Sequence, residues 1–368
     1  MDFLVLETCV LDKQDQPAFV ETRDWRKQLR LGADGGDYER KVKVLVRELS
    51  IIIVSWNGGD LLRQCLRCLA EHPPAVSYEV IIVDNASSDE SVAWLRSGEV
   101  QALLGEAPLL IIENPDNRGF AIANNQAIAA SNSPLIFLLN SDADVTAGAI
   151  DSLIATLQSD ARIGAVGPRL HNTDGTLQHS VWRNPPTVRE ILLNGSGLWR
   201  LIPKRVRGEW LLGGHWEHNQ RREVPMLFGA AILARRAMVD AVGGLDERFH
   251  MYSEDIEWCL RIVRGGWRLV FEPTAVVTHH GGQSALQRWT SAEKRRMQLN
   301  TFFEFQQRSL PRRQVVANQL ASYAVAWMNR TWRLLRGLPT EDVEMVLEVH
   351  REHVKRALRE EPAPPSRS

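Results

Sequence analysis

Two aspartates that follow an apolar run are the residues most able to do chemistry in this chain. Residues 135–139 are all hydrophobic, and Asp142 and Asp144 follow within a few positions. A buried strand would deliver both carboxylates to the end of a sheet, where open α/β sheets bind ligands. Neighbouring carboxylates repel unless a cation lies between them, and Mg²⁺ or Mn²⁺ with oxygen ligands would serve. The alternative is a polar turn, because Asp and Asn are common turn formers.

Three more polar clusters follow apolar runs, and the runs predict the elements that position them. The runs begin at residues 49, 79, 109 and 135, and helical patterns lie between them at residues 60–70, 89–96 and 120–130. This rhythm is typical of βαβ units and predicts a doubly wound, mostly parallel sheet with helices on both faces. Parallel strands would bring the polar clusters at residues 55–57, 84–89, 117–121 and 140–144 to one edge, as a single pocket.

The remaining chain continues this pattern with one interruption. A helix at residues 147–158 and a strand at 163–166 come next, and residues 195–225 then lack periodicity, so we expect a mobile, function-bearing loop there. The pattern then predicts a strand at 225–234, helices at 235–242 and 253–264, strands at 268–271 and 274–277, and helical structure over 293–336.

Composition excludes several classes of protein. The 368 residues are 44% hydrophobic and 24% charged with a net charge of −1, which is ordinary for a soluble globular protein and gives no reason to expect a nucleic-acid partner. No run reaches the ~20 apolar residues of a membrane span. Cys65 and Cys68 lack the second pair that a zinc site needs, so we expect a reduced, cytoplasmic protein. Neither G-x-G-x-x-G after the first strand nor a P-loop motif occurs, which excludes dinucleotide and P-loop binding.

Taken in order, these motifs resemble those of the family 2 glycosyltransferases. The upstream motifs occupy residues 51–57, 83–89, 117–120 and 139–142; those at 228–231, 243–249, 252–255 and 279–284 resemble the rhamnosyltransferase-like branch. The resemblance covers roughly residues 48–284. It implies a glycosyltransferase A-type fold, here with a helical C-terminal extension.

The resemblance implies a metal-dependent, inverting transfer of a sugar from a nucleoside-diphosphate donor to a hydroxyl of a polysaccharide or glycoconjugate. Our leading expectation is rhamnose carried on thymidine or uridine diphosphate. Asp84 should contact the nucleobase, and Asn117 and Gly119 should lie near the ribose. The full set of donor-binding residues implied by the match is Ser55, Asn57, Asp84, Asn117, Gly119 and Asn140.

The resemblance also implies a metal site for Mg²⁺ or Mn²⁺. Asn140 occupies the first position of the family's D-x-D metal motif, so Asp142 is the firmest expected ligand. Either Asp144 or Asn140 would complete the site. His279 resembles the family's histidine near the metal and diphosphate, although the sequence leaves open whether His279 or His280 faces the site. The metal would neutralise charge that develops on the leaving diphosphate.

By the same match, Asp255 is the general base that takes the proton of the acceptor hydroxyl, with Glu254 as the local alternative. Acidic residues are also favoured in any first helical turn by the helix dipole, which is the structural alternative. A single base without a nucleophilic partner fits inversion by direct displacement. Gly229 and Trp258 are the expected acceptor residues, Gly229 because a side chain there would block a close approach.

These expectations divide the chain into an N-terminal extension of unknown role (1–47), a catalytic domain (48–285), a basic helical region (286–360) and a disordered tail (361–368). Between residues 288 and 336 ten Lys/Arg stand against two Glu. This segment could lie on an anionic membrane as a peripheral contact at the inner membrane surface. Equally, residues 317–335 could be an amphipathic helix packed on the catalytic domain or on a second subunit.

Two rival functions remain at this stage. A nucleotidyltransferase uses a similar sheet and metal but should carry a basic, glycine-rich loop after its first strand, and residues 55–60 hold no Lys or Arg. A catalytically silent carbohydrate-binding or scaffold protein would explain Asn140 in the metal motif. Retention of Asp142, Asp255 and His279 together favours the enzyme.

Overall fold

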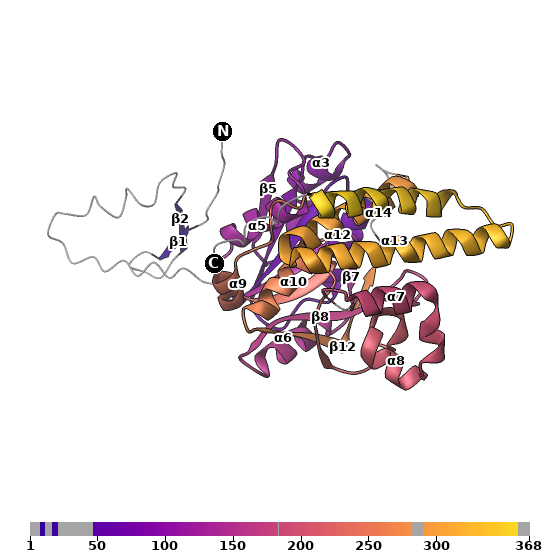
Figure 1. Ribbon diagram of the computed structural model, residues 1–368. Helices are drawn as coiled ribbons and strands as arrows, with labels where there is room; N and C mark the ends of the chain where they lie inside the picture. The colour runs from indigo at the N-terminus through magenta and orange to yellow at the C-terminus, as the bar shows by residue number, and fades with distance from the viewer. Residues whose placement is uncertain (1–7, 12–16, 21–46, 183, 282–289, 360–368) are drawn as a thin grey trace. The chain divides into compact units, whose positions relative to one another are not determined.

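The computed structural model describes residues 8–11, 17–20, 47–182, 184–281 and 290–359. The chain divides into two compact units, residues 1–46 and 47–368. In the first unit, β1 (Thr8–Leu11) pairs antiparallel with β2 (Pro17–Val20). Most of that unit and the tail expected at 361–368 lie outside the described residues. The second unit holds the remaining elements and every motif considered above (Figure 1).

Four parallel strands form the part of the sheet that carries the upstream motifs. They lie in the order β6 (Leu135–Asn140), β3 (Leu49–Ser55), β4 (Tyr78–Asp84) and β5 (Leu109–Glu113). In their register Ser55 pairs with Asp84, and Val54 pairs with Asn140. The polar residues that end these strands are therefore aligned at one edge, as the sequence predicted.

The other part of the sheet is mixed rather than parallel. β11 (Ala231–Arg235) is inserted antiparallel between β6 and β8 (Ile163–His171), and β12 (Arg268–His279) runs parallel to β8. The two short strands expected at 268–271 and 274–277 are thus one long strand. β7 (Ala143–Val145) and β10 (Arg222–Val224) pair antiparallel with β12, and β9 (Leu177–Gln178) with β8. Strand β11 is shorter than the expected 225–234.

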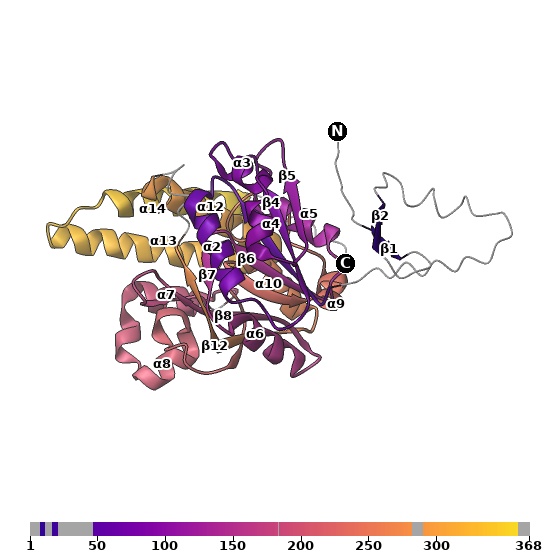
Figure 2. The ribbon, with the colours of Figure 1, turned by 180° about the vertical axis from the view of Figure 1, so that it is seen from behind.

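Helices cover both faces of this sheet, as expected (Figures 1 and 2). Alternate residues of β3 point to opposite faces, so Ile51 and Ile53 join one hydrophobic core and Ile52 joins the other. The first core includes α2 (Gly59–Glu71), α3 (Ser91–Arg96), α4 (Glu99–Leu104) and α6 (Ala149–Gln158). The second includes α5 (Phe120–Ala130), α9 (Arg236–Val242) and α10 (Glu254–Arg264).

Residues 195–225, which we expected to be a mobile loop, are largely helical as far as residue 215. They contain the end of α7 (Val188–Ser196), the 3₁₀ turns η1 (Leu198–Leu201) and η2 (Gly213–His215), and α8 (Lys204–Leu211) between them. Thr187 and Glu190 form a capping box at the start of α7, a local signal that the sequence carried. Short helices rich in Gly and Trp give little apolar periodicity, which explains why the pattern was missed.

The basic region forms three long helices, α12 (Ser291–Ser309), α13 (Arg312–Leu335) and α14 (Glu341–Arg359). Helix α13 packs against α14 and against α7. Helix α14 lies beyond residues 293–336, where the sequence pattern was helical, but within the region 286–360 that we expected to be helical. No helix in the described parts of the chain is long and apolar enough to cross a membrane.

Candidate active site

A cavity of about 820 Å³ lies at the polar ends of the parallel strands. Asn85 and Asn140, which follow or end strands β4 and β6, line one side of it. Asp255 of α10 and His279 at the end of β12 also line it, and helices α7 and α12 contribute further walls. The cavity therefore joins residues from motifs that are far apart in sequence.

Beside the cavity, the loops after β3 and β4 hold each other in place. Asp84 is buried, and its Oδ2 accepts a hydrogen bond from the Ser87 backbone N–H at 3.0 Å. Asn57 Oδ1 accepts from the Ser88 backbone N–H at 2.7 Å. Asp84 Oδ1 and the hydroxyl of Ser55 are buried without a hydrogen-bond partner among the described residues. These two oxygens keep hydrogen-bonding capacity that a bound polar group could use.

Asn85 organises the loop that carries Asn117 and Gly119. Its Nδ2 donates to Asn117 Oδ1 at 3.0 Å and to the Gly119 carbonyl oxygen at 3.3 Å, and its Oδ1 accepts from the Arg118 N–H. Gly119 has a φ of +86°, and a Cβ there would approach His250 Nδ1 to 2.6 Å. Asn85 and Asn117 line the cavity, whereas Gly119 is not among its lining residues. We had not singled out Asn85, although it directly follows Asp84.

The end of β6 and the end of β12 meet at an aspartate and a histidine. Asp142 Oδ1 lies 3.3 Å from His279 Nε2, and His279 Nδ1 lies 2.7 Å from Gln178 Oε1. The His279–Asp142 approach is within ion-pair distance but lacks hydrogen-bond geometry, so Nε2 keeps a free position. Asn140 Oδ1 is also buried without a hydrogen-bond partner in the described structure. Asn140, Asp142 and His279 all line the cavity.

A second histidine–aspartate pair lies next to the first but does not line the cavity. His280 Nε2 is 2.9 Å from Asp144 Oδ2. Strand β7, which carries Asp144, packs on helix α2, and the negative charge of Asp144 adds to the burial that raises the pKa of the Cys68 thiol. His279 and Asn140 therefore line the cavity, whereas His280 and Asp144 do not.

The described residues contain no group of three His, Cys, Asp or Glu side chains that could hold a metal ion. Asp142 and His279 supply two such groups, and Asn140 adds an amide oxygen without a partner. This set fits a cation that takes its remaining ligands from water and from a substrate diphosphate, as Mg²⁺ commonly does.

Asp255 and Glu254 are adjacent carboxylates at the start of α10, where Glu254 is buried and Asp255 is partly buried. Gly229 N–H donates to Asp255 Oδ2 at 3.0 Å, and Ile256 N–H donates to Oδ1 at 2.8 Å. Burial raises the pKa of Asp255, and these two N–H groups partly oppose that rise. Burial and the charge of Asp255 raise the pKa of Glu254, whose Oε2 has no hydrogen-bond partner among the described residues. Asp255 is therefore the better placed to stay ionised beside a neutral Glu254.

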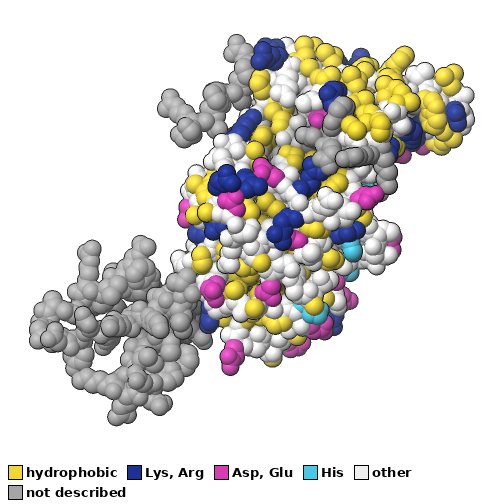
Figure 3. Space-filling view, turned by 90° about the horizontal axis from the view of Figure 1, so that it is seen from below, with side chains coloured by type: hydrophobic (Ala, Val, Ile, Leu, Met, Phe, Trp, Pro, Cys, Tyr) yellow, Lys and Arg dark blue, Asp and Glu magenta, His cyan; other side chains and the backbone are white. Residues whose placement is uncertain are grey.

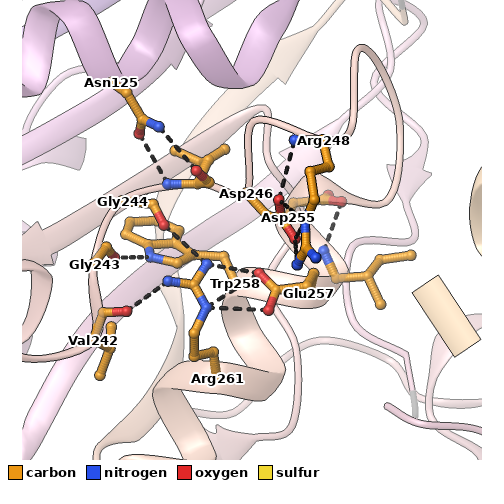
Figure 4. A network of polar contacts seen from close by, with 12 residues as sticks. Asn125, Val242, Gly243, Gly244, Asp246, Arg248, Asp255, Glu257, Trp258 and Arg261 are labelled. Atoms are coloured by element: carbon orange, nitrogen blue, oxygen red, sulfur yellow. Dashed lines mark hydrogen bonds and ion pairs between the residues drawn. The ribbon is translucent and has the colours of Figure 1, made fainter. Parts of the chain in front are cut away.

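Helix α10 is fixed by a polar network with the preceding loop (Figure 4). Arg261 donates to the carbonyl oxygens of Val242 (2.6 Å) and Gly244 (2.9 Å) and pairs with Glu257 at 2.6 Å. Asn125 of α5 holds the same loop through both backbone groups of Leu245. These contacts hold the start of α10, and with it Asp255, against the sheet.

Trp258 requires a correction, because we expected it to contact the acceptor. Its side chain is fully buried in the second core, and its Nε1 donates to the Gly243 carbonyl oxygen at 2.9 Å. Although Trp258 lies only one turn after Asp255, its indole ring packs into this core and not into the cavity. Trp258 supports the helix and does not line the cavity.

Several cavity residues come from the basic C-terminal region, which we had not connected with the site. Lys294, Arg295 and Gln298 of α12 line the cavity, as does Asn194 of α7. The run Lys294-Arg295-Arg296 was visible in the sequence, but only packing shows which of these side chains reach the cavity.

Comparison with known proteins identifies a glycosyltransferase domain in this chain. Residues 50–214 match the family model described as Glycosyl transferase family 2. The chain is 28% identical over 254 residues to N-acetylglucosaminyl-diphospho-decaprenol L-rhamnosyltransferase of Mycobacterium tuberculosis, covering 64% of this chain and 77% of that protein. It is 28% identical over 238 residues to the O-antigen biosynthesis protein RfbC of Myxococcus xanthus, covering 64% of this chain and 18% of that protein.

A solved structure shows the same fold. The mannosyltransferase PcManGT from Pyrobaculum calidifontis, in complex with GDP-Man and Mn²⁺, aligns with a TM-score of 0.51 at 18% identity over 87% of this chain and 78% of that one. The mixed sheet and its helices are those of a glycosyltransferase A-type enzyme. The chain is a glycosyltransferase whose residues 50–214 match family 2, and it is similar to a rhamnosyltransferase. The nucleotidyltransferase and silent-scaffold interpretations are set aside.

Proposed function

We propose that this enzyme transfers rhamnose from a thymidine or uridine diphosphate donor to a hydroxyl of a glycan or lipid-linked glycan, with inversion. The observation that carries the proposal is one cavity that is lined by the base candidate Asp255 together with the Asp142–His279 pair. The similarity to an enzyme named as a rhamnosyltransferase that acts on a decaprenol-linked diphosphate supports the sugar and the acceptor class.

We assign catalysis to residues 48–285, with the helical region 286–360 as part of the same functional unit. Lys294 and Arg295 of α12 line the cavity, so the C-terminal region completes the site that the sheet begins. Their positive charge suits a phosphate group, such as the diphosphate of a lipid-linked acceptor.

The donor nucleotide would lie along the loops after β3 and β4. Asp84 Oδ1 and the Ser55 hydroxyl are buried polar groups with unused hydrogen-bonding capacity, which fits recognition of a nucleobase. Asn57 holds the loop that follows Asp84 through its bond to Ser88. Asn117, fixed by Asn85, would lie near the ribose, with Gly119 shaping the floor behind it.

Asp142, His279 and Asn140 would hold a divalent cation, Mg²⁺ or Mn²⁺, together with the donor diphosphate. When bound, the cation neutralises the charge that develops on the leaving diphosphate. His279 is oriented for this role by Gln178, which fixes its other ring nitrogen. We leave Asp144 out of this set, because it pairs with His280 and does not line the cavity.

Asp255 would act as the general base. Its carboxylate takes the proton of the acceptor hydroxyl while the hydroxyl oxygen forms a bond to the anomeric carbon and the bond to the diphosphate oxygen breaks. One displacement from the face opposite the leaving group inverts the anomeric centre. Gly229 and Ile256 orient the carboxylate, and its raised pKa makes it a stronger base than an exposed aspartate.

The test is to measure transfer and nucleotide binding in Asp255→Asn and in the control Glu257→Gln. Asp255→Asn should lower kcat by about 10²- to 10⁴-fold while the donor nucleotide still stabilises the protein against heating. Glu257 lies on the same helix but pairs with Arg261 outside the cavity, so its variant should retain transfer. Full activity in Asp255→Asn would contradict the assignment of the base.

A further inference from the structure

Helix α13 carries an unusual solvent-exposed apolar face. Leu320, Trp327, Met328, Trp332 and Leu335 recur at spacings of 7, 8, 12 and 15 residues from the first, which places them on one side of a helix. Trp327 is 54% exposed, Trp332 51% and Leu335 83%. Single exposed hydrophobic residues are common, but a continuous stripe that includes two tryptophans marks an interaction surface.

The opposite side of α13 is already used within the chain. Gln319 Oε1 lies 3.2 Å from His350 Nδ1 of α14, and Asn318 donates to the Pro186 carbonyl oxygen beside α7. Val315 and Ala326 are buried on that side. The two expectations for this helix therefore apply to different sides, because the inner side packs on the enzyme while the stripe remains free for another partner.

Positive charge accompanies the stripe. Two of the five arginines in residues 312–336, Arg313 and Arg336, are spaced to lie on or beside the stripe, and the segment has no acidic residue. The other three bond to the Leu358 carbonyl oxygen, to Glu344 and to the Pro339 carbonyl oxygen on the side of α14. Arg336 lies over the Trp332 ring with its guanidinium carbon 4.9 Å from the ring centroid. In Figure 3 hydrophobic side chains gather with Lys and Arg at the upper right, on the side toward which the α13–α14 hairpin extends in Figure 1.

We infer that this face of α13 binds the surface of an anionic lipid bilayer. Tryptophan and leucine side chains partition into the interfacial region, while arginine side chains reach the lipid phosphates. A second copy of the chain fits less well, because a symmetric contact through the stripe would bring Arg313 and Arg336 of both copies into it, and α13 has no acidic residue to pair with them. No described helix can span a membrane, so the contact is peripheral.

The surface is directly connected to the active site. Val325 of α13 packs so closely on α7 that a Cβ at Gly195 would come within 2.1 Å of it. Ile191 and Asn194 of the same helix α7 line the cavity. Contact of α13 with a bilayer would thus keep one cavity wall near the membrane. This purpose rests on the proposed lipid-linked acceptor, whereas the lipid contact itself does not.

The experiment is co-sedimentation of the full chain with phosphatidylcholine vesicles, with and without phosphatidylglycerol. The wild-type chain should sediment with the anionic vesicles, and less so at high salt. The triple variant Trp327→Ser/Trp332→Ser/Leu335→Ser should lower the partition coefficient roughly a hundredfold. The single variants Trp332→Ser and Leu358→Ser form a matched pair, because Leu358 is 56% exposed on α14 but lies outside the stripe, and only Trp332→Ser should weaken binding.

Equal sedimentation of the wild-type chain and the triple variant would overturn the inference, as would failure of the wild-type chain to bind anionic vesicles. A wild-type dimer that the triple variant dissociates, measured by analytical ultracentrifugation, would overturn it in favour of a subunit interface. The assay needs neither donor nor turnover. Vesicle binding without transfer to any lipid-linked acceptor would therefore refute the proposed function and leave the membrane surface standing.

Discussion

Two histidine–aspartate pairs with the same composition lie side by side in this enzyme and have different surroundings. Asp142 and His279 line the cavity, whereas Asp144 and His280 do not. Asp142 lies in the turn between β6 and β7, where the backbone changes direction, while Asp144 lies within β7 and is held by pairing with β12. Two carboxylates that are two residues apart can therefore have different surroundings, because one lies in a turn and the other in a strand.

Among substitutions that compare the two pairs, replacing each aspartate by asparagine should show the largest difference. Asp142→Asn should lower kcat/KM for transfer by about 10²- to 10³-fold, because it removes the charge that would hold the cation at the diphosphate. Asp144→Asn should change it by less than about tenfold. Steady-state kinetics at saturating Mn²⁺ measures both, and a greater loss in Asp144→Asn would break the comparison.

The histidines should differ in the same way but less strongly. His279→Gln should weaken activation by Mn²⁺ about 10- to 100-fold, because Gln178 and the cavity orient His279 toward the proposed ligand set. His280→Gln should leave the metal dependence unchanged. Activity as a function of Mn²⁺ concentration separates the two variants, and equal shifts would show that both pairs contact the cation.

A similar comparison can be made on helix α10 between Glu254, which has no ion-pair partner among the described residues, and Glu257, which pairs with Arg261. The pKa of Glu254 is raised in the folded protein, so its ionisation costs stability as pH rises above the unfolded value. Glu254→Gln should therefore raise the free energy of unfolding by on the order of 1 kcal/mol at pH 8 and change it little at pH 4. Glu257→Gln, which loses an ion pair with Arg261, should not stabilise the protein. Denaturant unfolding at both pH values measures this, and stabilisation that is independent of pH would exclude the explanation.

The smallest effect on activity is expected for a substitution of Gly229, whose N–H donates to the proposed base Asp255. A Cβ at Gly229 would lie 3.2 Å from Asp255 Cβ, a contact that a shift of a few tenths of an ångström relieves. Gly229→Ala should lower kcat several-fold, up to about tenfold, by moving the carboxylate, while the melting temperature changes little. A large fall in melting temperature would instead assign Gly229 a structural role.

The sequence predicted most elements of the parallel half of the fold. Helix α5 was placed at its observed bounds, and the four motif-bearing strands were placed to within a residue or two. These elements could be predicted because their apolar period is local and each polar cluster directly follows its strand. The antiparallel insertion of β11 was missed, since the partner of a strand depends on residues far away in the chain.

What the sequence by itself determined is the set of polar groups that end or follow the strands, Asp84, Asn140, Asp142 and His279, and the carboxylate Asp255 at the start of a helix. Only the tertiary structure decided which side chains line the cavity and which pack elsewhere. It paired Asp144 with His280 outside the cavity lining, buried Trp258, brought Gly229 onto Asp255 across 26 residues, and added α12 to the cavity wall. The reason is that residue type and period fix which chemistry is available at a strand end. The direction of a side chain, in contrast, is fixed by packing against elements that are remote in sequence.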